Sequence, residues 1–208
     1  MFVKESDGSA KKSWVYLVPR FVKNHRSIRV SSKNRTCRWY GFMVFWKLKM
    51  ITFEKKNICS SGLIQEIENH IAVSFPENFK TLISEYDGES PNQECLDFYD
   101  TNNNKNISTS AHFLSFKERW YGSLLSTYQN PPEFFPKGLI AFAEDGGGNL
   151  ICFDYRKGKD NANPPIVFWN HEADIGKDIS FIADSFDEFL SMLKSEEEIE
   201  ALESSNSP

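Results

Sequence analysis

The chain has 208 residues, of which 40% are apolar and 25% charged; this excludes a fibrous or disordered chain and leaves room for one domain with a sizeable core rather than two. No apolar run approaches the roughly 20 residues that cross a bilayer, and the longest aromatic-rich run extends only from Trp39 to Trp46, so we expect no membrane span. The formal net charge of −5 hides an asymmetry, because residues 1–50 hold 12 Lys and Arg against 2 Asp and Glu, whereas the rest hold 12 against 27.

Residues 1–49 form a basic segment that mixes Arg, Lys, Trp and Ser without a sustained period of 2 or 3.6. We assign no stable element to this segment and expect a poorly ordered extension. A basic arm with interleaved aromatic residues is also typical of segments that bind nucleic acid or an acidic surface, and this alternative stays open. Composition and periodicity change at Met50, so the predicted domain covers residues 50–194.

Two amphipathic helices are predicted next. The first covers about residues 61–71; Ser60 or Ser61 can cap it, and its apolar face holds Leu63, Ile64, Ile67 and Ile71. In the second, Pro76 suits the first helical position and Gly88 lies where a helix stops. Its apolar face, at i, i+3, i+4 and i+7, holds Phe79, Leu82, Ile83 and Tyr86.

Residues 89–112 are polar and rich in Asn, and they predict a loop with one short strand near residues 96–99. After Gly138, three short apolar segments bounded by turn residues predict strands of one sheet, at residues 139–143, 150–153 and 166–169. Ser185 and Glu188 then predict a capping box for a closing helix, whose apolar face holds Phe186, Phe189, Leu190 and Leu193. The acidic tail, residues 195–208, is expected to be flexible.

The four cysteines lie far apart, without a CxxC pair or a histidine at metal-ligand spacing: Cys37, Cys59, Cys95 and Cys152. This pattern argues against structural zinc. The first residues lack the pattern of a secretory signal, so we expect a cytoplasmic protein with free thiols.

The string AEDGGGNLICFD, residues 143–154, invites a phosphate-loop interpretation because of its three consecutive glycines. A phosphate loop needs GK[ST], and a dinucleotide site needs GxGxxG at the start of a helix. Here the glycines lead into another strand. We therefore interpret residues 145–149 as a hairpin turn, in which glycine supplies positive φ.

The string FWNHEAD places His171, Glu172 and Asp174 close together, but Ile175 stands where an HExxH zinc motif needs its second histidine. We expect no metal site and no cofactor. No nucleophile elbow, Ser–Lys motif or Cys–His signature is present, so we also expect no catalytic residues.

Four strings follow one another in the chain: FPENFKTLISEYDG, GLIAFAEDGGGNLICFDY, PIVFWNHE and SFDEFLSML. Together they resemble the SUKH superfamily, in particular its Smi/Knr-type branch, which is named partly for a fungal cell-wall assembly regulator. The match covers most of residues 64–193. The second string is the most specific, since it combines a strand, a glycine-rich turn and a second strand ending at Asp154. Residues 1–49 have no counterpart, and residues 101–108 fall where the family varies.

The resemblance implies a single α+β domain with a largely antiparallel sheet and helices packed against it. It also implies a protein-binding module without enzymatic activity. Bacterial members look like immunity proteins that bind a polymorphic toxin, for example a nuclease, by stoichiometric contact. Fungal members look like regulatory scaffolds, which is the first alternative; an enzyme or nucleotide-binding protein that uses the glycine-rich turn is the second. No feature of the sequence sets the oligomeric state.

Charge and position together suggest a partner-binding surface. Residues 51–208 carry a net charge of −15, which would attract a basic toxin domain rather than nucleic acid, although the tail supplies five of these charges. Two acidic segments each follow a predicted strand and would form one patch if they share an edge of the sheet. In the alternative, Trp169 faces the core and the acids only solubilise the loops; Trp120 and Tyr121 are then the next candidates. The candidate residues are Glu144, Asp145, Trp169, His171, Glu172 and Asp174.

Overall fold

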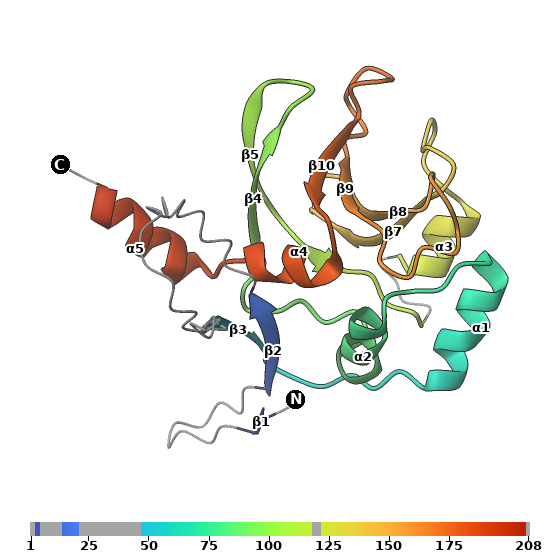
Figure 1. Ribbon diagram of the computed structural model, residues 1–208, viewed down its shortest axis with the longest axis horizontal. Helices are drawn as coiled ribbons and strands as arrows, with labels where there is room; N and C mark the ends of the chain where they lie inside the picture. The colour runs from blue at the N-terminus through green and yellow to red at the C-terminus, as the bar shows by residue number, and fades with distance from the viewer. Residues whose placement is uncertain (1–2, 5–13, 21–46, 118–121, 207–208) are drawn as a thin grey trace, which may run out of the picture.

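The computed structural model describes residues 3–4, 14–20, 47–117 and 122–206, drawn as ribbons in Figure 1. Its strands are β1 (Val3–Lys4), β2 (Trp14–Arg20), β3 (Lys47–Phe53), β4 (Cys95–Asp100), β5 (Lys105–Ser110), β6 (His112–Phe113), β7 (Leu139–Glu144), β8 (Leu150–Asp154), β9 (Ile166–Trp169) and β10 (Ile179–Ala183). Its helices are α1 (Ser61–Ile71), α2 (Glu77–Tyr86), α3 (Leu124–Gln129), α4 (Phe186–Met192) and α5 (Glu196–Asn206).

The main sheet has five strands in the order β10-β9-β8-β7-β6, and each neighbouring pair is antiparallel. Strands β4 and β5 form a two-stranded sheet, and β1-β2-β3 form a three-stranded one. Helices and antiparallel sheets together make a single α+β domain. The predicted fold class is therefore confirmed, as are the three predicted strands, which correspond to β7, β8 and β9.

The predicted helices also form, with caps close to those expected. The Ser60 hydroxyl accepts a hydrogen bond from the Leu63 backbone N–H at 3.2 Å, so Ser60 rather than Ser61 caps α1. At α4, the Ser185 hydroxyl accepts from the Glu188 N–H at 3.2 Å. The Glu188 carboxylate accepts from the Asp184 N–H, one residue before the position that a capping box uses.

The core is an aromatic cluster between two helices and one face of the main sheet. Phe79 on α2 lies 5.0 Å from Phe153 on β8, measured between ring centroids, and 5.1 Å from Phe186 on α4. Phe142 on β7 lies 5.4 Å from Phe189 on α4. All five rings are fully buried. Helices α2 and α4 therefore cover this face, and the loops at the strand ends stay available for contacts.

Residues 95–110 form a hairpin, β4–β5, where the sequence predicted a loop with one short strand. The sequence pattern did not predict β5, because this strand, KNISTS, has a single apolar residue and none of its residues is buried. Strand β4 buries Leu96 and Phe98, and the Phe98 ring lies 5.3 Å from that of Phe168 on β9. The hairpin thus packs on the main sheet rather than extending into solvent (Figure 1).

Strand β2 lies within residues 1–49, to which the sequence analysis assigned no element. It pairs with β3 over its full length, from Trp14↔Phe53 to Arg20↔Lys47, and also contacts α4. Strand β3 crosses the predicted boundary at Met50, and its residues Ile51 and Phe53 are fully buried. At the other end, α5 lies within the predicted acidic tail. The limits of the domain, residues 50–194, stay a prediction.

Candidate functional site: the loop edge of the main sheet

One row of residues crosses the main sheet where β7 and β9 end and where β8 and β10 begin. The register places His112 opposite Glu144, Glu144 opposite Leu150, Leu150 opposite Trp169, and Trp169 opposite Ile179. Directly opposed residues point to the same face of a sheet. We call this end the loop edge and define it by residues 144–149 and 169–178. It includes both acidic segments singled out by the sequence.

The turn between β7 and β8 is organised by the Asp145 carboxylate. Its Oδ1 accepts hydrogen bonds from the backbone N–H groups of Gly147 at 2.8 Å and Asn149 at 3.0 Å. Its Oδ2 accepts from the side chains of Asn149 at 2.8 Å and Thr109 at 3.1 Å. Partial burial alone would raise the pKa of this carboxyl, but the hydrogen bonds from Asn149, Gly147 and Thr109 outweigh it and lower the pKa below its ordinary value.

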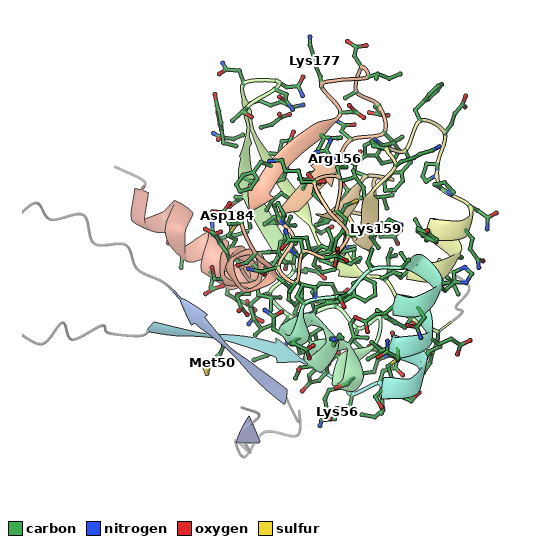
Figure 2. All side chains as sticks on the ribbon, turned by 45° about the vertical axis from the view of Figure 1, so that its right-hand side comes forward. Met50, Lys56, Arg156, Lys159, Lys177 and Asp184 are labelled. Atoms are coloured by element: carbon green, nitrogen blue, oxygen red, sulfur yellow. The ribbon has the colours of Figure 1, made fainter. Side chains whose placement is uncertain are left out.

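The loop between β9 and β10 is anchored by Asp178, which is 7% exposed. Its Oδ2 accepts from the Trp169 indole N–H at 3.2 Å, and its Oδ1 accepts from the Gly176 N–H at 2.8 Å. The Asn170 N–H donates to the Asp178 carbonyl at 2.8 Å. These contacts fix both ends of the loop. Lys177 of this loop lies at the end of the molecule away from Lys56 and Met50 (Figure 2).

The tip of the β4–β5 hairpin supports the same loop from the side. The Asn103 side chain donates to the Lys177 carbonyl at 3.3 Å, and that of Asn102 donates to the Ile179 carbonyl. The Asp100 carboxylate holds both asparagines by accepting from their backbone N–H groups, at 2.9 and 3.2 Å. The Asn-rich segment, predicted as a loop of no assigned role, therefore braces the loop edge.

Asn149 joins the two loops of the edge. Its Oδ1 accepts from the His171 backbone N–H at 3.2 Å and lies 3.0 Å from the His171 ring nitrogen Nδ1. The imidazole lies over Gly148, where a Cβ atom would come within 3.1 Å of the ring carbon Cε1. Gly148 also has φ of +92°, a conformation that favours glycine. The glycine at position 148 thus leaves room for the His171 ring and supplies the positive φ that the turn requires.

The six candidate residues take different positions on the loop edge. His171, Glu172 and Asp174 are exposed, whereas Glu144 and Asp145 are half-buried. Trp169 is 2% exposed, and Phe135 packs edge-on against its ring. Its indole belongs to the core, so the aromatic group available at this edge is His171.

The structure brings together groups that the sequence analysis did not connect. Asn149 and Thr109 complete the turn network, and Ile175, at 79% exposure, adds an apolar side chain to the loop.

Trp120 and Tyr121, the second candidates for an interface, lie outside the described residues. Within the described ranges, no group of three or more His, Cys, Asp and Glu is arranged to hold a metal ion. No helix in the same ranges is long and apolar enough to cross a membrane.

Comparisons with known proteins give a family match and a curated relative. Residues 58–192 match the model of the SMI1 / KNR4 family (SUKH-1). A curated relative, the SPbeta prophage-derived uncharacterized protein YokK of Bacillus subtilis (strain 168), is 29% identical over 170 residues, covering 72% of this chain and 84% of the relative. The matched region runs from the residues before α1 to the end of α4 and includes the whole loop edge.

Proposed function

The chain belongs to the SMI1 / KNR4 family (SUKH-1), and on this basis we propose that it is an immunity protein, which binds a cognate toxin and neutralises it by stoichiometric contact. The observation that carries the proposal is the family match over residues 58–192, since this family includes toxin-immunity proteins. Neutralisation by contact requires no catalytic residue, cofactor or metal. The protein then works in the cytoplasm, where a delivered toxin would act.

The loop edge is the surface that we propose for toxin binding. It exposes Glu172 and Asp174 on a loop whose backbone is fixed by Asp178 and by the β4–β5 hairpin. A fixed loop loses little conformational entropy on binding, which favours affinity. The partner that fits exposed carboxylates is a basic protein domain, such as a nuclease whose own site attracts phosphates.

Lys177 lies on the same loop and is also exposed, so the edge is not uniformly acidic. This lysine offers a contact of opposite sign beside Glu172 and Asp174. An interface with both signs of charge discriminates between partners, because a wrong partner places like charges together. We therefore expect the loop edge to contribute to partner choice as well as to affinity.

A test starts from the reading frame next to the gene. Its product is expressed in a host cell with and without this chain, and growth is measured. We expect growth arrest by the toxin alone, rescue by co-expression, and co-purification of the two proteins. A neighbouring frame that encodes no toxin, together with binding to regulatory proteins instead, would favour the scaffold function found in other members of the family.

A further inference from the structure

A chain of hydrogen bonds determines which nitrogen of His171 carries the proton. The Asp145 carboxylate only accepts, so the amide nitrogen of Asn149 must face it, and the two atoms lie 2.8 Å apart. The other end of the same amide, Oδ1, then faces His171. This oxygen already accepts from the His171 backbone N–H, which confirms its orientation independently of the ring.

The same oxygen lies 3.0 Å from the ring nitrogen Nδ1 of His171. A carbonyl oxygen can only accept, so in the neutral imidazole Nδ1 must be the protonated nitrogen. The proton-free nitrogen is then Nε2. His171 is exposed, and within the described part of the chain no hydrogen bond to its Nε2 is found.

We propose that His171 is a specificity-determining residue of the loop edge, preset with its proton on Nδ1 so that Nε2 accepts a hydrogen bond from an arginine or lysine side chain of a basic protein partner. The proposal rests on the proposed function, since it names a contact within that binding surface. It assigns to Asp145 and Asn149 a positioning role, because they act through His171.

Three features of the surroundings support this role. The ring packs over Gly148, and the Trp169 ring lies 6.4 Å away between centroids, so the imidazole has contacts on more than one side. The exposed carboxylate of Glu172 follows directly in the chain, and that of Asp174 lies on the same loop. Lys177 is exposed on this loop too, but acidic residues outnumber basic ones in it, so its charge favours a cationic donor over an acidic group.

The tautomer can be measured without a toxin. The full chain is labelled with nitrogen-15 in its histidines, and two-bond proton–nitrogen correlation spectra are recorded at alkaline pH, where the imidazole is neutral. We expect the Nδ1–H pattern for His171, in contrast to the Nε2–H form that solvent-exposed imidazoles usually prefer. Asn149→Ala should shift the signals of His171 toward Nε2–H, whereas the control Asn163→Ala, in an exposed loop, should leave them unchanged. An Nε2–H pattern in the unaltered chain overturns the proposal.

Recognition is tested with a hexa-arginine peptide and an uncharged hexa-citrulline peptide as probes. We expect the arginine peptide alone to move the Nε2 resonance of His171, and Asn149→Ala to weaken its binding by about two- to tenfold, as for the loss of one hydrogen bond. The recognition role is overturned if the unaltered chain and Asn149→Ala bind the arginine peptide with equal affinity. It is also overturned if the arginine peptide has no effect on the His171 signals. These readouts differ from growth rescue, so failure of toxin neutralisation and failure of this contact are distinguishable.

Discussion

At the scale of single residues, five fully buried phenylalanine rings connect the two helices to the sheet. Helical spacing predicted three of them, Phe79, Phe186 and Phe189, whereas Phe142 and Phe153 lie within strands that were predicted without assigning their rings to the core. The residues of the loop edge could be predicted only in part. His171, Glu172 and Asp174 stand out as a polar string, but the contact between Asn149 and His171 depends on the register that places Leu150 opposite Trp169. Sequence alone does not determine this register, because buried strands lack the alternation that would define it.

The first prediction concerns the core. Replacing Phe79 or Phe189 by Ala should lower the free energy of unfolding by about 3–5 kcal/mol, because each change leaves a cavity among fixed rings. Phe181→Ala is the matched control, since this ring is 50% exposed, and it should cost below about 1 kcal/mol. Urea unfolding measures all three. Small losses at both buried sites would mean that the rings do not pack as described.

The second prediction concerns Asp145, whose pKa is lowered in the folded protein. Such a carboxylate stabilises the fold at pH values above the unfolded pKa of about 3.9, and this stabilisation is lost as the pH falls through the folded pKa. The free energy of unfolding of the unaltered chain should therefore be higher than that of the Asp145→Asn variant. This difference should be larger at pH 7 than at pH 3. Asp160→Asn, in an exposed loop, should change the stability little at either pH. An equal deficit of Asp145→Asn at both pH values would show that its charge is not what stabilises the turn.

The third prediction concerns the exposed charges of the loop edge. The double change Glu172→Lys and Asp174→Lys should slow association with a basic toxin and flatten its salt dependence, because rim charges act mainly on the association rate. Lys177→Glu, on the same loop, should have the opposite effect. Stopped-flow measurements at low and moderate salt give both rates. Unchanged kinetics in variants that still fold would exclude the loop edge and direct attention to the segment with Trp120 and Tyr121.

At the scale of elements, the segments with clear periodicity were predicted and the others were not. Helices α1, α2 and α4 each have an apolar face, and a serine hydroxyl caps α1 and α4. Strands β7, β8 and β9 are short apolar runs between turn residues. Strand β2 has a mostly apolar sequence, WVYLVPR, without alternation, and β5 is almost entirely polar. Both were missed because pairing with a neighbouring strand, rather than their own pattern, determines their conformation.

The fourth prediction concerns the start of the domain. A chain beginning at Met50 should keep cooperative unfolding, because Phe53 stacks on Tyr86 at 4.0 Å between centroids and the Asn57 backbone bonds to Glu85 and Asp87. A chain beginning at Ser60 loses these contacts together with the buried Ile51 and should be several kcal/mol less stable. Thermal unfolding compares the two. If the chain that begins at Met50 unfolds without cooperativity, β2 belongs to the folding unit.

At the scale of the whole molecule, the helices and the antiparallel sheet form a scaffold whose loops are connected to one another by hydrogen bonds. The loop edge consists of the β7–β8 turn and the β9–β10 loop, and the β4–β5 hairpin lies beside it. Side-chain hydrogen bonds join all three segments. Such an arrangement supports the proposed function, in which the protein binds a toxin at the loop edge.

The most direct test of that function is a titration of toxin activity. The purified full chain is added to a fixed amount of the toxin domain encoded beside its gene, and the remaining activity is measured against the molar ratio. Neutralisation by contact predicts a linear fall that ends at a stoichiometric ratio, with the complex recovered intact by size-exclusion chromatography. Full activity in the presence of excess chain, or complete loss at far below stoichiometric amounts, as an enzyme would cause, would contradict the proposed function.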